Sequence, residues 1–476
     1  MRALAFAMAA LCCMMPARAD NSLPDLGDVS EAVLSLNQER AIGWNAMRQI
    51  RQSPVFLDDP EVTEYLNRIG YRLVSVSPDT RMDFTFFALR DPSVNAFAMP
   101  GGYIGVHTGL LLAAQSESEL ASVLAHEVSH VTQRHIARLV AQQQRAGMTS
   151  LAALAIAILA ARSNPQAAAG AIAAAQAQQL SSRLAFTRDN EREADRTGVS
   201  ILEKAGFDPH AMPVFLERLQ KATRIYDSAN FPSYLRTHPV TFERIADVQN
   251  RTFDLPYRQV PDSLDFFLVR AKVRAQQGDA RDAVSFFRDS VAERKFANEV
   301  AARYGLVTAL LRAEDLPGAD RELRTLLDMA PGNAMILTLR ARLMLAQKNR
   351  DGAIQLLADG VKRYPQSRGI AYDYADALLG ARRPQEALTV LDNQLMQDSS
   401  DGRLYELQAK AYSQIGKPMQ EHKALAEVNI AAGNLQGAME QLQLALRSGD
   451  GDFYEMSSIE ARLRELRTYL ARQDQK

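Results

Sequence analysis

The sequence predicts a mostly helical α+β domain with a small antiparallel sheet, followed by an all-α solenoid of helical repeats. Three observations lead to this prediction. Apolar residues recur at helical spacing over residues 30–50 and 60–76. Short aromatic and β-branched runs between residues 82 and 107 are typical of strands. Beyond about residue 261 the chain becomes helical and repetitive, and its length of 476 residues is sufficient for two or three domains.

The start of the chain has the pattern of a signal peptide. Arg2 precedes an apolar run, Leu4–Met15, and residues 16–19 read Pro-Ala-Arg-Ala, which provides an A-x-A cleavage site. A membrane anchor is the alternative, but the apolar run is too short to span a bilayer. We therefore expect residues 1–19 to be a signal peptide and the mature chain to lie outside the cytoplasm.

Composition limits the classes of partner and of metal ligand. The formal net charge is −1 and there is no basic run, so nothing indicates binding to nucleic acid or to an anionic membrane surface. Cys12 and Cys13 are the two cysteines of the sequence, and both lie in the predicted signal peptide. The mature chain therefore has no thiol, and a zinc site in it must use histidine and carboxylate ligands.

Three strands and a long helix are predicted in the middle of the first domain. The strands are Met82–Leu89, Ala96–Met99 and Tyr103–His107, and a small antiparallel sheet is their simplest arrangement. Ser116 and Glu119 have the spacing of a capping box, which predicts the start of a helix directly after the sheet. The apolar residues of this helix recur on one stripe, so we expect a buried amphipathic helix.

The motif His126-Glu127-Val128-Ser129-His130 falls on this predicted helix. His126 and His130 are one turn apart and project from the same face, so both imidazoles can bind one Zn²⁺. Glu127 then lies close enough to act on a water held at the metal. The alternative interpretation is a pair of core histidines beside an exposed glutamate.

A catalytic zinc site of this kind needs a third protein ligand. The downstream candidates are Asp189, Glu191, Glu193, Asp195 and His238. On a helix beginning near residue 187, Glu191 and Asp195 share a face, whereas Glu193 points about 160° away from it. Glu191 as the ligand and Asp195 as the hydrogen-bond partner of a ligating imidazole satisfy both requirements from one face. The alternative is an ordinary charged first turn of a helix.

Two further segments follow the motif. Residues 151–161 are nearly all apolar and too short to span a membrane, so they form either a buried or gating hairpin or a peripheral membrane contact. Beyond residue 261 an alanine recurs at intervals of 36, 34 and 34 residues: Ala283, Ala319, Ala353 and Ala387. This is the period of tetratricopeptide repeats, whose stacked helix pairs leave a concave binding surface. A plain helical bundle is the alternative.

These motifs resemble those of the Ste24/Oma1-like family of gluzincin zinc metallopeptidases. The resemblance rests on residues 126–130 and 191–195 and extends to 95–98, 206–209 and 237–239. Some members of the family also have a signal peptide and C-terminal repeats. The resemblance to these members covers nearly the whole expected mature chain. It implies a gluzincin-type metalloprotease domain followed by a tetratricopeptide-repeat domain.

The expected domain boundaries are residues 20–260 for the protease and 261–476 for the repeats. In the family, the zinc ligands are the two motif histidines and the first glutamate of the second motif. The resemblance thus assigns the zinc to His126, His130 and Glu191, and the role of general base to Glu127.

The resemblance also assigns roles to two residues that spacing alone does not single out. His238 is implied as a fourth, regulatory zinc ligand, which would displace the attacking water and leave the site closed. Arg244 is implied to lie near the reaction centre, where it can hold a developing oxyanion. The other histidines share no face with the motif and are interpreted as structural or solvated: His107, His135, His210 and His422.

The expected function is that of a periplasmic endopeptidase with one Zn²⁺ per chain. An extended substrate would add as a strand beside Tyr103–Val106 or beside the segment made of Ala96, Phe97, Ala98 and Met99. The resemblance implies that the clients are unfolded or stalled outer-membrane β-barrel proteins, which are degraded when misfolded, and the β-barrel assembly machinery. The alternative function is a chaperone or adaptor that acts through its repeats while the zinc site stays mostly latent.

Overall fold

The structure is a computed structural model that describes residues 33–79, 81–145, 188–222 and 234–474. The predicted signal peptide and the apolar segment 151–161 lie outside the described residues. The first part of the chain contains a small sheet and these helices: α3 (Leu36–Arg51), α4 (Pro60–Val74), α5 (Thr108–Ala113), α6 (Glu117–Thr132), α7 (His135–Arg145), α10 (Arg188–Lys204), α11 (Ala211–Ala222), α12 (Tyr234–Thr237) and α13 (Phe242–Phe253).

The sheet has three strands in the order β1-β3-β2: β1 (Thr85–Leu89), β2 (Ala96–Met99) and β3 (Tyr103–His107). β2 and β3 form an antiparallel hairpin, but β1 pairs with β3 in parallel, so the expected purely antiparallel pairing is corrected for β1. The alternation of apolar residues shows which face of a strand is buried and does not show which strand it pairs with. β3 is central and β2 lies at an edge, so a substrate strand cannot add beside Tyr103–Val106.

The hairpin between β2 and β3 depends on glycine at its turn. Gly101 and Gly102 both have positive φ, at 80° and 82°, which is the left-handed region that other residues avoid. A Cβ atom on Gly102 would lie 2.0 Å from the Asp83 carbonyl oxygen, so a side chain has no room there. This tight turn returns the chain so that β3 enters the sheet between β1 and β2.

Helix α6 is the centre of the first domain. Its N-cap is Ser116, as the sequence predicts, and the Ser116 hydroxyl accepts a hydrogen bond from the Glu119 amide at 3.1 Å. Only this half of the predicted capping box forms, because the Glu119 carboxylate accepts from the Gln115 amide at 2.6 Å and not from Ser116. All residues from 117 to 131 are buried, because α4, α10, α11 and β2 pack around the helix. The helix is therefore buried on every side, and the predicted single apolar stripe is too narrow a description of it.

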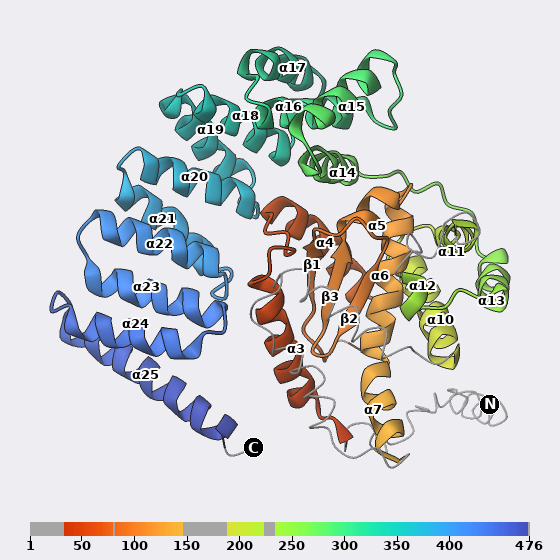
Figure 1. The fold of residues 1–476 in the computed structure, drawn as a ribbon, viewed down its shortest axis with the longest axis horizontal. Helices are drawn as coiled ribbons and strands as arrows, with labels where there is room; N and C mark the ends of the chain where they lie inside the picture. The colour runs from red at the N-terminus through yellow and green to blue at the C-terminus, as the bar shows by residue number, and fades with distance from the viewer. Residues whose placement is uncertain (1–32, 80, 146–187, 223–233, 475–476) are drawn as a thin grey trace, which may run out of the picture.

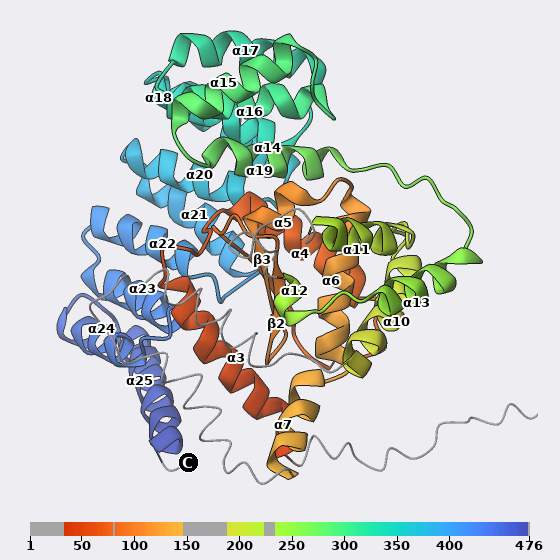
Figure 2. The ribbon, with the colours of Figure 1, turned by 45° about the vertical axis from the view of Figure 1, so that its right-hand side comes forward.

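The second part of the chain is a series of helix pairs that forms an arc around α3 and α4 (Figures 1 and 2). The predicted repeat alanines are all buried in the second helices of their pairs, which confirms the solenoid. No helix in the described ranges is long and apolar enough to cross a membrane. The repeat helices are α14 (Leu264–Gln276), α15 (Ala280–Ala292), α16 (Glu299–Arg312), α17 (Leu316–Met329), α18 (Ala334–Ala346), α19 (Arg350–Arg363), α20 (Arg368–Gly380), α21 (Pro384–Leu395), α22 (Gly402–Gln414), α23 (Pro418–Ala431), α24 (Leu435–Arg447) and α25 (Phe453–Asp474).

The N-terminal end of α4 fits into the inner side of this arc through buried charges. Lys272 of α14 lies 2.6 Å from the Asp59 carboxylate and also pairs with Glu61. Glu61 accepts a further hydrogen bond from the Thr338 hydroxyl of α18. Burial alone would raise the pKa of Asp59, but the Lys272 ammonium outweighs it and the pKa lies below its ordinary value. The first domain thus occupies part of the repeat groove.

Candidate metal centre

Four buried side chains from three separate segments converge beside the sheet. His126 and His130 come from α6, Glu191 from α10, and His238 directly follows α12. Helix α10 approaches α6 closely at Gly198, where a Cβ atom would lie 3.4 Å from the His126 main-chain nitrogen. Glycine at this crossing brings the carboxylates of α10 within reach of the imidazoles of α6.

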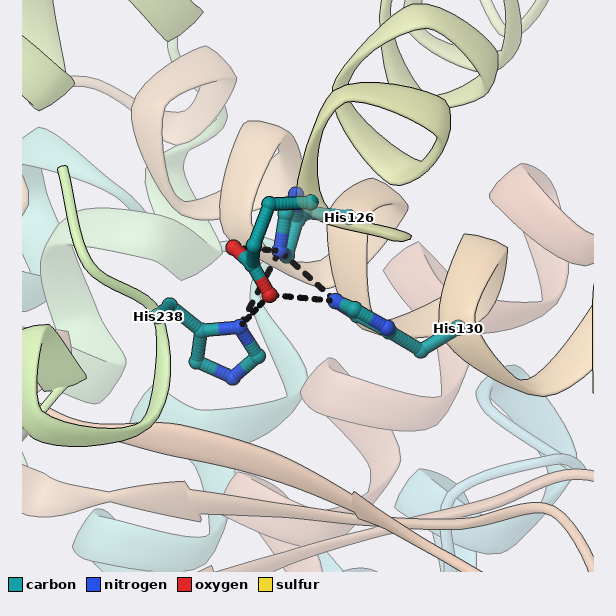
Figure 3. Close-up of side chains that lie close together, drawn as sticks. His126, His130 and His238 are labelled. Carbon is teal, nitrogen blue, oxygen red and sulfur yellow. Dashed lines mark hydrogen bonds and ion pairs between the residues drawn. The ribbon is translucent and has the colours of Figure 1, made fainter. Parts of the chain in front are cut away.

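The donor atoms of these four residues form a compact group (Figure 3). The two Nε2 atoms of His126 and His130 are 2.9 Å apart, and the Nδ1 atom of His238 lies 3.3 Å from Nε2 of His126. The Glu191 carboxylate lies 2.9 Å from His238 Nδ1, 3.4 Å from His130 Nε2 and 3.5 Å from His126 Nε2. Donors around a tetrahedral zinc ion with bonds of about 2.0 Å are separated by about 3.3 Å. The separations therefore fit one metal ion at the centre of the group.

The charges around the group also fit a cation. Burial alone would raise the pKa of Glu191, but His238 and Arg244 hold it well below its ordinary value, so the carboxylate is ionised. Burial alone would lower the pKa of His126, but the Asp195 and Glu191 carboxylates outweigh it and raise the pKa to about 10. Two buried carboxylates against one guanidinium leave a net negative charge, which a proton or a metal ion must balance. Nitrogen and oxygen donors of this kind are those that zinc prefers.

Asp195 and Arg244 contact residues of the donor group and help to fix their positions. The Asp195 carboxylate lies 2.9 Å from His126 Nδ1, the position that the shared helix face predicts for it. Arg244 donates to both oxygens of Asp195 at 2.8 Å and to the Pro239 carbonyl at 2.9 Å, and lies 2.6 Å from Glu191. The guanidinium is thus engaged with carboxylates, and its role towards an oxyanion stays a prediction.

Glu127 is fully buried next to the donor group. The main-chain amide of Ala98 on β2 faces its carboxylate, one oxygen of which lies 3.4 Å from His238 Nε2. Burial raises the pKa of Glu127 above its ordinary value, against the opposing influence of His238 and His126. A carboxylate of raised pKa close to a metal site has the properties of a general base.

The segment Ala96–Met99 coincides with strand β2, which lies at the edge of the sheet and packs against α6. Among the described residues no further strand pairs with its outer edge, so main-chain groups of an extended peptide can add there. The opposite edge is partly covered, because Phe56 forms a bridge with Leu89 of β1. The assignment of Ala96, Phe97, Ala98 and Met99 to substrate binding stays a prediction.

Two residues beside the centre were not identified from the sequence. The Tyr234 ring stacks on His238, with ring centroids 4.7 Å apart and planes 26° apart. His135, interpreted as structural or solvated, has its Nδ1 atom 2.7 Å from Nδ1 of His130. Tyr234 lies four positions before His238, so helical spacing offers a signal for it, whereas His135 lies five positions after His130 and periodicity gives no signal for it. The other three histidines have partners outside the group: Ser93 and Asp91 for His107, Asp208 for His210 and Gln441 for His422.

Comparison with known proteins agrees with this geometry. The chain matches peptidase family M48 over residues 60–252 and the tetratricopeptide repeat over residues 274–343 and 344–411. It is 35% identical over 456 residues to the beta-barrel assembly-enhancing protease of Escherichia coli (strain K12), covering 95% of this chain and 93% of that protein. The protease of the same name from Yersinia pestis is 32% identical over 450 residues, covering 94% and 92% of the two chains.

A more distant relative matches a smaller share of the chain. The mitochondrial metalloendopeptidase OMA1 of Schizosaccharomyces pombe (strain 972 / ATCC 24843) is 31% identical over 223 residues, covering 45% of this chain and 61% of that protein. The four converging side chains all lie within the M48 match, and the repeats follow it. These findings confirm the resemblance expected from the motifs. The chain belongs to the beta-barrel assembly-enhancing protease family, and it joins an M48 metallopeptidase domain to tetratricopeptide repeats.

Proposed function

We propose that this metallopeptidase is a zinc-dependent endopeptidase of the periplasm that assists the assembly of outer-membrane β-barrel proteins and degrades misfolded or stalled ones. The observation that carries the proposal is the buried group of four donors with Glu127 beside it and an edge strand next to it. The names of the relatives support a role in barrel assembly. The signal-peptide pattern of residues 1–19 supports export from the cytoplasm.

In this proposal His126, His130 and Glu191 hold one Zn²⁺, which when bound would polarise the scissile carbonyl and activate a water. Asp195 orients the His126 imidazole through their 2.9 Å contact. Arg244 positions both carboxylates of α10, since it contacts Glu191 and Asp195 together.

Glu127 carries the proton transfer. Its carboxylate takes a proton from the attacking water and returns it to the nitrogen of the leaving amine, which requires both protonation states to be accessible. The raised pKa of the buried carboxyl brings the protonated state closer to neutral pH than an exposed glutamate allows. The peptide is held in extended form along β2, where main-chain hydrogen bonds make little demand on its sequence.

His238 is proposed to keep the site closed in the resting state. Its Nδ1 atom belongs to the donor group and its Nε2 atom faces Glu127 at 3.4 Å, so the ring stands between the general base and the donor centre. The ring is 1% exposed and stacks on Tyr234. A peptide and a water can reach Glu127 only when the His238 ring moves away.

The repeats are proposed to select the clients. Tetratricopeptide solenoids bind proteins on their inner surface, and the partners proposed here are unfolded or stalled barrel proteins and the machinery that assembles them. Residues 1–19 are proposed to direct export. Segment 151–161 is proposed to form either a buried or gating hairpin or a peripheral membrane contact.

A second candidate function is that of a chaperone or adaptor with a mostly latent metal site. The fourth donor, His238, favours this alternative, because a site with four protein ligands has no position for an attacking water. The two functions are compatible at different times, and they differ in whether Glu127 is needed.

The test is the variant Glu127→Gln, which keeps the shape of the side chain and removes its basicity. We expect it to abolish cleavage of an unfolded barrel protein by the full chain, measured with purified protein and zinc. If cleavage and the cellular phenotype both survive, the protease proposal is wrong. If cleavage is lost while barrel assembly is still helped, the adaptor function stands by itself.

A further inference from the structure

The two ligating histidines of α6 are oriented in different ways. His126 has a carboxylate, Asp195, directly on its Nδ1 atom at 2.9 Å. His130 instead has a second imidazole on its Nδ1 atom, that of His135, at 2.7 Å. The far nitrogen of His135, Nε2, lies 3.3 Å from the Glu193 carboxylate, which also pairs with Arg138 at 2.9 Å.

We propose that His135, held by Glu193, is the positioning residue that orients His130 towards the metal. The inference deepens the proposed function, since it rests on His130 being a zinc ligand. It also gives a role to Glu193. This residue points away from the helix face that carries Glu191, so it cannot bind the same metal ion.

The proton positions along this chain of groups agree with each other. A histidine that binds a metal through Nε2 has its lone pair there, so its proton is on Nδ1. That proton needs an acceptor, which the Nδ1 atom of His135 provides when the proton of His135 is on Nε2. The Nε2–H of His135 then faces the Glu193 carboxylate. The Nδ1–H group of His130 and the Nε2–H group of His135 therefore each meet an acceptor, and Nε2 of His130 keeps its lone pair for the metal.

A bend in the chain brings His135 to this position. Helix α6 ends at Thr132 and α7 begins at His135, and Arg134 between them has a φ of 54°, in the left-handed region. This conformation is unfavourable for a residue with a side chain. It is secured because Arg134 is buried and pairs with Glu39 at 2.7 Å. The bend turns the first residue of α7 back against the end of α6, so the His135 ring, which is fully buried, meets His130.

The exposure of the groups sets their order of importance. His135 is fully buried, whereas the Glu193 side chain is 45% exposed and that of Arg138 is 34% exposed. Solvent can replace part of what Glu193 provides, but it cannot reach the contact between the two imidazoles. We therefore expect His135 to matter more for metal binding than Glu193.

The test compares zinc affinity, measured by competition with a chelator of known affinity, for purified full-length variants. His135→Leu removes the acceptor, and we expect a 10-fold to 100-fold weaker affinity, the usual effect of losing such a partner. His135→Asn places a carbonyl oxygen near the position of the imidazole Nδ1, so we expect it to recover most of the affinity. We expect Glu193→Gln to weaken binding less than His135→Leu does.

Two control variants have the same residue types away from the site. His210→Leu removes a histidine that pairs with Asp208, and Glu203→Gln changes an exposed glutamate on the same helix as Glu193. Both are expected to bind zinc as the unmodified protein does. Circular dichroism checks that each variant is folded; if His135→Leu does not fold, His135→Asn and Glu193→Gln carry the test.

A spectroscopic measurement separates orientation from packing. With Co²⁺ in place of zinc at saturation, the visible absorption bands are expected to change in His135→Leu and to stay close to the original in His135→Asn. Affinity within twofold of the unmodified protein in His135→Leu overturns the proposal, as does an equal loss in both variants with unchanged bands. If the unmodified protein binds no zinc, or if Glu191→Gln binds it equally well, the metal centre itself is wrong, which is a different failure.

Discussion

The buried Lys272 between the two domains gives the most quantitative prediction. The residue is 1% exposed, and its ammonium lies 2.6 Å from Asp59 and also pairs with Glu61, so one positive charge serves two buried carboxylates. The variant Lys272→Met keeps a side chain of similar length and removes the charge. Breaking a buried pair in this way costs about 3–5 kcal/mol, because the partner charge stays buried without compensation. We expect this loss in the free energy of unfolding at pH 7.

The assay is urea unfolding of the full chain, together with hydrogen exchange of the amides of α4 and α14. We expect a lower urea midpoint and faster exchange at both helices, because the two domains contact each other there. Arg464→Met is the matched control, since Arg464 pairs with Glu460 at 3.7 Å on the surface with its side chain 68% exposed. Such a surface pair contributes about 0–1 kcal/mol. A midpoint for Lys272→Met that equals that of the control refutes the reasoning.

The pH dependence of this variant provides a second check. The pKa of Asp59 is lowered in the folded protein, so its contribution to stability is present above its ordinary pKa of 3.8 and is lost as the pH falls through the lower folded value. Without the Lys272 ammonium, the Asp59 anion is disfavoured and Asp59 takes up a proton more readily. The deficit of Lys272→Met is therefore expected to shrink as the pH falls towards 4. The double change with Asp59→Asn should recover part of the stability at pH 7.

Two further predictions concern another interdomain contact and the closed site. Burial raises the pKa of Glu64 from 4.5 to about 7, although it accepts hydrogen bonds from the Arg368 and Gly369 amides of α20. The folded protein therefore loses up to about 3 kcal/mol as the pH rises from 4.5 through 7. Glu64→Gln should raise the urea midpoint at pH 8 and leave it unchanged at pH 4.5; equal effects at both pH values contradict this. His238→Ala should increase cleavage of an unfolded substrate relative to His210→Ala, measured by the rate of product formation, and unchanged or lower activity argues against a closed resting site.

The sequence predicted the parts of the site that depend on helical spacing. His126 and His130 come together because four residues make about one helical turn, and Glu191 and Asp195 share a face for the same reason. The direction from which α10 approaches α6 was not needed for these pairings. The fold class was predictable too, since the repeat period and the buried alanines are local properties of the chain.

What the sequence did not predict depends on contacts between distant segments or on an unusual backbone angle. The contact of His135 with His130 requires the left-handed conformation of Arg134, and nothing in the residue type indicates it. The parallel pairing of β1 with β3 requires the third strand to enter between the first two. Lys272 meets Asp59 across 213 positions of sequence, so no spacing rule connects them.

The left-handed bend at Arg134 limits how many residues can be removed from the N-terminus. The guanidinium that secures the bend pairs with Glu39 and donates to the Leu34 carbonyl, so residues of the first described turns support a metal ligand almost a hundred positions further along. Processing that removes only residues 1–19, the proposed signal peptide, leaves this support intact. Trimming that continues past Glu39 would release Arg134 and loosen the metal centre while every ligand is still present. The shortest chain that keeps the proposed metal centre supported is thus set by the contacts of Arg134 with Leu34 and Glu39.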